Sequence, residues 1–81
     1  MEEEIQDKIR KKYNEEILRI EVSFKEFRNY IIEGTLLFRN AIGFNFLYKY
    51  DSNMSLENNI FNIENIIDNF IIKICKYKEE K

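Results

Sequence analysis

The chain has 81 residues, 44% of them hydrophobic and 15% aromatic, which is enough for one domain, residues 1–81, with a single modest core. Thirteen basic and fifteen acidic residues give a formal net charge of -2, which excludes a global positive field that would attract nucleic acid or an anionic membrane. One cysteine excludes an internal disulfide framework, and without a secretion-type start or about 20 consecutive apolar residues we expect a cytoplasmic protein outside any membrane.

The first predicted element is a helix over residues 2–14. Ile5, Ile9 and Tyr13 recur every four residues and give the segment one apolar face. Acidic residues at positions 2–4 stand where the helix dipole favours negative charge, and basic residues follow them.

From residue 17 the apolar period changes to two, which predicts a half-buried strand. The residues expected to face inward are Leu18, Ile20, Val22 and Phe24. A second interpretation continues the first helix to residue 31, because helical steps of three and four also fit part of the segment. The residues that fit those steps are Ile17, Ile20, Phe24, Phe27 and Ile31. We prefer the strand, since clean alternation recurs in three successive segments and a helix would leave the other two as a bare hairpin.

Two further alternating runs predict a second and a third strand. The second is expected to place Tyr30, Ile32, Gly34, Leu36 and Phe38 inward. The third is expected to place Ile42, Phe44, Phe46, Tyr48 and Tyr50 inward. Short connections near residues 25–29 and 39–43 make two consecutive hairpins and hence an antiparallel meander.

A long helix is predicted over residues 55–77, with Ser55 placed to cap its first turn. Its apolar stripe consists of Leu56, Ile60, Ile63, Ile67, Phe70, Ile74 and Tyr77. The predicted fold class is therefore α+β: a helix, a three-stranded antiparallel meander and a long C-terminal helix (αβββα), with both helices on one face of the sheet.

Double-stranded RNA-binding domains share this order of elements, and the prediction resembles them at that level alone. Those domains grip phosphates with a lysine cluster at the start of their last helix. The residues at that place here are Ser55, Leu56, Glu57, Asn58 and Asn59. Because the cluster is missing, we do not assign the chain to that family.

Three groups of residues are candidate contacts with a protein partner. Phe61 and Ile72 lie away from the apolar stripe of the last helix, so they are either exposed contact residues or covered by the first helix or the sheet edge. A ridge of uncharged donors and acceptors is formed by Asn58, Asn62, Asn65 and Asn69, unless it merely reflects codon bias toward Asn. The far face of the sheet is predicted to carry Ile31, Leu37 and Leu47 with Arg19, Arg39 and Lys49 nearby.

A basic cluster in the first helix is the candidate nucleic-acid contact, and its residues are Lys8, Arg10, Lys11 and Lys12. Acidic neighbours compensate this cluster, and no aromatic side chain is interleaved with it, so a solvated helix face is the simpler interpretation.

The sequence predicts no enzyme, no cofactor and no metal site. It contains no histidine, which removes the usual proton shuttle and the commonest metal ligand. Nucleophile arrangements of the Ser-His or Cys-His type are therefore excluded.

The expected function is stoichiometric binding to another protein or protein complex, with homodimerisation through the last helix or the open sheet face as a compatible arrangement. Abundant Ile, Asn and Lys with little Gly or Pro indicate an AT-rich genome, and for so short a chain we associate this bias with a phage or mobile element. The sharper hypothesis is an inhibitor of a bacterial nucleic-acid-targeting defence complex, of the anti-CRISPR kind, acting in the host cytoplasm. The alternatives are a small nucleic-acid-binding protein and an accessory subunit of a larger cellular complex.

Overall fold

The computed structural model describes residues 2–26 and 30–79, with side chains at 2–24 and 31–74. The elements in chain order are α1 (Glu2–Lys12), β1 (Ile17–Glu26), β2 (Tyr30–Phe38), β3 (Gly43–Lys49) and α2 (Leu56–Glu79). The predicted αβββα order and the α+β class are confirmed.

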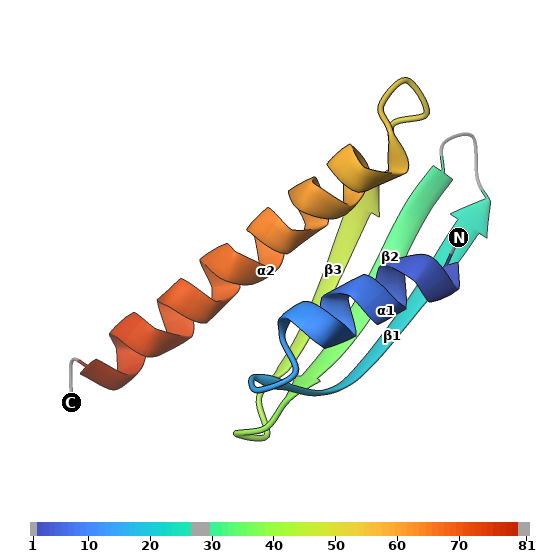
Figure 1. The fold of residues 1–81 in the computed structure, drawn as a ribbon. Coiled ribbons are helices and arrows are strands. Elements are labelled where there is room, and N and C mark those ends of the chain that lie inside the picture. The colour runs from blue at the N-terminus through green and yellow to red at the C-terminus, as the bar shows by residue number, and fades with distance from the viewer. Residues whose placement is uncertain (1, 27–29, 80–81) are drawn as a thin grey trace.

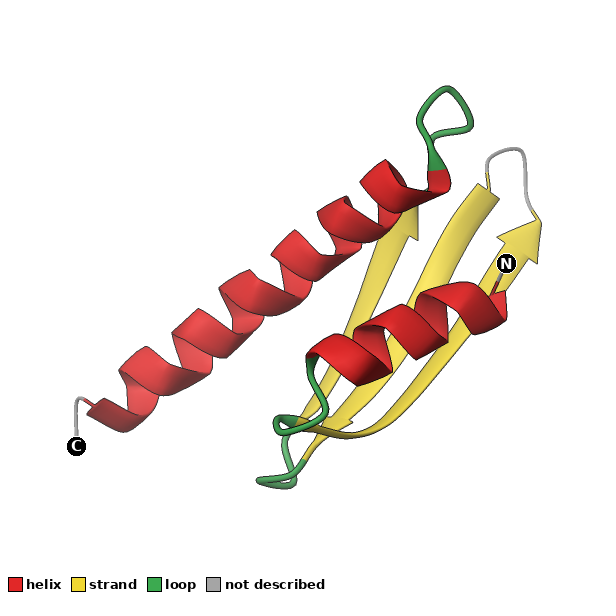
Figure 2. Cartoon of the chain, in the orientation of Figure 1, coloured by secondary structure: helices red, strands yellow, loops and turns green. Residues whose placement is uncertain are grey.

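The three strands form one antiparallel sheet in the order β1-β2-β3, so each strand pairs with its neighbour in the sequence. Both helices lie on the same face of this sheet, with α1 across β1 and β2 and α2 alongside β3 (Figures 1 and 2). This layering agrees with the prediction. The first predicted connection includes residues 27–29, which lie outside the described residues.

The ambiguous segment after α1 is a strand, and the alternative that continues the helix to residue 31 is wrong. β1 pairs with β2 along its length, from Ile17 opposite Phe38 to Glu26 opposite Tyr30. Its β-branched and aromatic residues pack well on a pleated, half-buried surface, so tertiary packing agrees with local preference here.

The prediction that Leu18 faces inward is wrong because β1 begins with a bulge. Ile17 lies opposite Phe38 and Arg19 lies opposite Leu37, which leaves Leu18 without a partner on β2. The extra residue places Ile17 in the core, while the Leu18 side chain is 58% exposed. From Ile20 onward the predicted alternation holds.

The core lies between the helices and the inner face of the sheet. Both helices contribute their predicted apolar stripes, and each strand contributes inward positions. The buried apolar side chains are Ile5, Ile9, Tyr13, Ile17, Ile20, Val22, Ile32, Leu36, Phe38, Phe46, Ile60, Ile63 and Ile67. The predicted inward residues Tyr30 and Tyr77 lie outside the described side chains.

The helix α2 is capped at its start and packs on the sheet farther along. Near its start, the Ser55 hydroxyl accepts a hydrogen bond from the backbone N–H of Asn58 at 3.1 Å, which is the predicted N-cap. Farther along, the Phe70 ring stacks on Phe44 with 4.0 Å between centroids and lies 5.5 Å from the ring of Phe38. Figure 1 shows α2 starting near the end of β3 and running back beside it.

Candidate functional site

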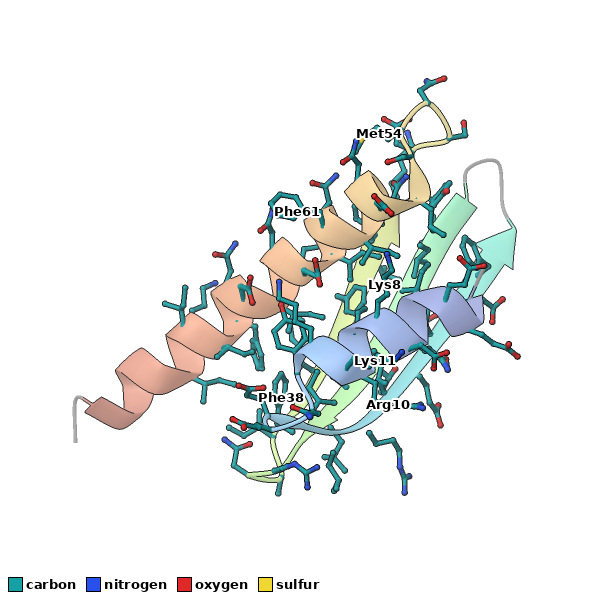
Figure 3. All side chains as sticks on the ribbon, in the orientation of Figure 1. Lys8, Arg10, Lys11, Phe38, Met54 and Phe61 are labelled. Carbon is teal, nitrogen blue, oxygen red and sulfur yellow. The ribbon has the colours of Figure 1, made fainter. Side chains whose placement is uncertain are left out.

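The side of α2 turned away from the sheet is an exposed surface whose centre carries no charge, between the exposed charged residues Glu57 and Lys73. We call it the outer face of α2, and its members are Asn58, Phe61, Asn65, Asn69 and Ile72. The Phe61 side chain is 58% exposed and Ile72 is 53% exposed, so neither α1 nor the sheet edge covers them. Figure 3 shows Phe61 projecting on the side of α2 away from the strands.

The centre of this face lacks charge because Glu64 and Asp68, the acidic residues beside Phe61 and Ile72 on the helix surface, are directed to α1. The Tyr13 hydroxyl donates to Asp68 Oδ1 at 2.5 Å and lies 3.1 Å from the backbone carbonyl oxygen of Glu64. The Lys12 ammonium lies 3.5 Å from the Glu64 carboxylate. These contacts join the two helices and take both carboxylates away from the outer face.

Burial raises the pKa of the Tyr13 phenol well above its ordinary value of 10.0, and the hydrogen bond to the Asp68 carboxylate raises it further. The phenol therefore stays protonated in the folded protein under conditions that ionise it in the unfolded chain. Its stabilising effect is complete below pH 10 and is lost as the pH rises above that value.

Replacing Tyr13 by Phe is therefore expected to lower the free energy of unfolding by about 1 kcal/mol at neutral pH, through loss of the hydroxyl contacts. The variant should also lose less stability than the wild type between about pH 9 and pH 11. Urea unfolding across that pH range measures both effects. The control is Tyr50→Phe, because the Tyr50 hydroxyl makes no hydrogen bond within the described part of the chain. Equal pH slopes for the wild type and Tyr13→Phe would contradict the assignment.

The predicted Asn ridge is divided by the structure. Asn58, Asn65 and Asn69 are exposed and belong to the outer face of α2. Asn62 is half-buried, and its amide donates to the Tyr48 hydroxyl at 3.2 Å. Three members of the ridge are thus available to a partner, while the fourth helps to dock α2 on β3.

Sequence reasoning missed the neighbouring residue Asn59, which is completely buried. Its side-chain oxygen accepts hydrogen bonds from the Tyr48 hydroxyl at 2.8 Å and the Asp51 N–H at 2.9 Å. Its amide nitrogen donates to the backbone oxygens of Asp51 and Ser55, each at 2.9 Å. Asn59 therefore fixes the β3–α2 connection and is a structural residue.

The far face of the sheet is a mixed surface, as predicted. Leu47 is 69% exposed, whereas Ile31 and Leu37 are half-buried. Each has a charged residue opposite it on a neighbouring strand: Glu33 faces Leu47, Lys49 faces Ile31 and Arg19 faces Leu37. The Arg39 guanidinium is directed to the backbone oxygen of Asn14, at 3.1 and 3.3 Å. Apolar and charged groups alternate here, so the face lacks a continuous apolar patch.

The basic cluster of α1 is spread around the helix and partly compensated. At about 100 degrees per residue, consecutive residues such as Lys11 and Lys12 point in different directions. Lys12 is paired with Glu64, and Arg10 lies 3.9 Å from the Asp7 carboxylate. Lys8, Arg10 and Lys11 remain exposed along α1 (Figure 3).

The described residues contain no group of three or more His, Cys, Asp or Glu side chains placed to hold a metal ion. Among the helices of the described chain, none is both long and apolar enough to cross a membrane. An open pocket of about 220 Å³ lies beside Phe38, Ile71 and Ile74, with Glu15 and Glu16 at its rim. No family model, curated protein or solved structure matches the chain.

Proposed function

We propose that the protein acts by binding another protein through the outer face of α2. The observation that carries this proposal is the exposure of Phe61 and Ile72 on a helix face whose centre carries no charge, in a chain of which 35% of the residues are charged. Cores of protein interfaces are depleted in charged residues and enriched in aromatic ones. A few side chains in well-packed, fully desolvated pockets supply most of the binding energy of an interface.

The polar members of this face suit the same role. Asn65 lies between Phe61 and Ile72 on the helix surface, and Asn58 and Asn69 flank this row. Their amides can donate and accept hydrogen bonds without the desolvation cost of a charged group. The favoured partner therefore offers an uncharged surface with apolar pockets and backbone or side-chain hydrogen-bonding groups.

Affinity purification of the tagged protein from a nuclease-treated lysate of its natural host tests this proposal. We expect a stoichiometric protein partner that is identified by mass spectrometry. Phe61→Asp or Ile72→Asp should weaken its binding by at least about tenfold. Leu18→Asp is the matched control, because Leu18 is as exposed as Phe61, at 58%, but lies at the start of β1.

Loss of the partner in the Leu18 variant but not in the Phe61 and Ile72 variants would contradict the proposed surface. Recovery of a nuclease-sensitive species in place of a protein would favour the nucleic-acid alternative, which Lys8→Glu and Lys11→Glu would then test. That the partner belongs to a bacterial nucleic-acid-targeting defence complex, bound by a phage or mobile-element inhibitor, stays a prediction. The identity of the captured partner decides it.

A further inference from the structure

The two edge strands of the sheet, β1 and β3, differ in whether other parts of the chain bond to their outward backbone groups. On β1, the backbone N–H of Val22 donates to Gln6 Oε1 at 2.9 Å, and that of Phe24 donates to Glu2 Oε1 at 3.4 Å. Side chains of α1 thus accept hydrogen bonds from backbone N–H groups that point outward from this edge strand. The bulge at Leu18 also distorts the start of the strand. Both are known protections against pairing with another strand.

The direction of the backbone groups of β3 follows from these contacts. The N–H groups of Val22 and Phe24 point away from β2, and the direction alternates along each antiparallel strand. Even-numbered residues of β2 consequently bond to β3, in agreement with the hydrogen bond from the Phe38 N–H to the Ile42 oxygen at 2.8 Å. The backbone groups that point to the outer edge of β3 are those of Gly43, Asn45, Leu47 and Lys49.

The backbone groups of this outer edge are unpaired in the described part of the chain. None of its four residues makes a hydrogen bond there, and the pairing of β2 with β3 contains no bulge. The sequence has no proline, and Lys49, at the end of β3, is the strand's one charged residue. An edge of this kind is a template for one more strand.

We propose that the missing strand is β3 of a second copy of this chain, paired antiparallel about a two-fold axis at Phe46. Phe46 is the middle residue of the seven in β3, so this register pairs the whole strand with itself. Gly43 then lies opposite Lys49 of the second copy, and Asn45 opposite its Leu47. All four outward N–H groups meet outward carbonyl oxygens in hydrogen-bonded pairs.

The side chains suit the same register. In this register even-numbered residues lie opposite even-numbered residues, so side chains on the inner face of one copy meet side chains on the inner face of the other. Phe46 meets Phe46 of the second copy, and Phe44 meets its Tyr48. The partly exposed rings of Phe44 and Tyr48 would thereby lose water contact. The two Lys49 side chains lie at opposite ends of the new strand pair, so the edge opposes no like charges.

The dimer has one six-stranded sheet with all four helices on the same side, because the two-fold axis is perpendicular to the sheet. It therefore presents two outer faces of α2 in the same direction. This inference goes beyond the proposed function and does not rest on it, since the β3 edge and the outer face of α2 are separate surfaces.

The mass of the purified protein in solution is the first test. Light scattering should give about twice the chain mass of 10.0 kDa. A protein that stays monomeric up to about 100 µM would overturn the proposal.

Two double variants test the register. In Asn45→Lys with Leu47→Lys, like charges face each other twice across the two-fold axis. In Asn45→Glu with Leu47→Lys, opposite charges face each other at the same places. In both variants the lysine at position 47 lies opposite Glu33 of its own chain, so any attraction between these two residues is the same in the two proteins. The dimer dissociation constant of the first should exceed that of the second by about tenfold.

Equal dissociation constants, with far-UV circular dichroism showing both proteins folded, would overturn the register and place the interface elsewhere. A second pair guards against misfolding of the charged variants. Asn45→Pro removes an outward N–H that bonds nothing in the described part of its own chain, and it blocks the approach of another strand, whereas Asn45→Ala keeps that group. The Pro variant should be monomeric and the Ala variant dimeric. A dimeric Pro variant would exclude pairing through β3.

Discussion

Replacing Asn59 by Ala is expected to lower the free energy of unfolding by about 3 kcal/mol. The side chain is fully buried and satisfies its whole hydrogen-bonding capacity, with two bonds accepted and two donated. Truncation leaves the Asp51 N–H without its acceptor. The Tyr48 hydroxyl and the backbone oxygens of Asp51 and Ser55 each lose one of their hydrogen bonds. Urea denaturation followed by far-UV circular dichroism measures the loss.

Asn58→Ala is the matched control for this prediction. It removes the same chemical group from the next position, where the side chain is exposed, so we expect a change within about 0.5 kcal/mol. Similar losses in the two variants would show that the buried network does not fix the β3–α2 connection. Tyr48→Phe, which removes one bond, should fall between them at about 1 kcal/mol.

Much of the fold was predictable because each element shows a strong period. Ile5, Ile9 and Tyr13 define one helical face, and residues such as Ile32 and Leu36 alternate cleanly in a strand. The choice of strand over helix after α1 was decided by consistency among three segments and not by the local pattern. The error at Leu18 has a physical cause. The extra residue of a bulge moves the side chains before it to the opposite face of the sheet, and the types of residue in the strand do not reveal it.

The candidate site was predictable only in part. A helical wheel places Phe61 and Ile72 away from the core stripe, and the structure shows both exposed. The same helical wheel places Asn59 within the apolar stripe, three residues after Leu56 and four before Ile63, and Asn58 away from it. What the sequence does not show is the set of partners from β3 and the following turn that satisfies the buried amide. Similarly, the sequence does not show which edge strand has its backbone groups bonded by α1. The tertiary structure shows that it is β1 and not β3.

Gly34→Ala is expected to cost about 3 kcal/mol, because the Phe46 ring packs directly over the glycine on the neighbouring strand. A Cβ at position 34 would overlap three ring carbons of Phe46, a core residue that is only 5% exposed. The ring must then leave its place, at the cost of overpacking and lost burial. The thermal midpoint should fall by roughly 15 °C.

Gly43→Ala is the control for the Gly34 substitution, since a Cβ at position 43 meets only the Leu36 backbone oxygen at an ordinary 3.9 Å. It should be neutral or slightly stabilising, because alanine restricts the unfolded chain more than glycine does. In a Phe46→Leu background, which removes the ring, Gly34→Ala should cost less than in the wild type. An unchanged cost there would place the strain in the backbone of β2, and equal effects of the two glycine substitutions would contradict the ring contact altogether.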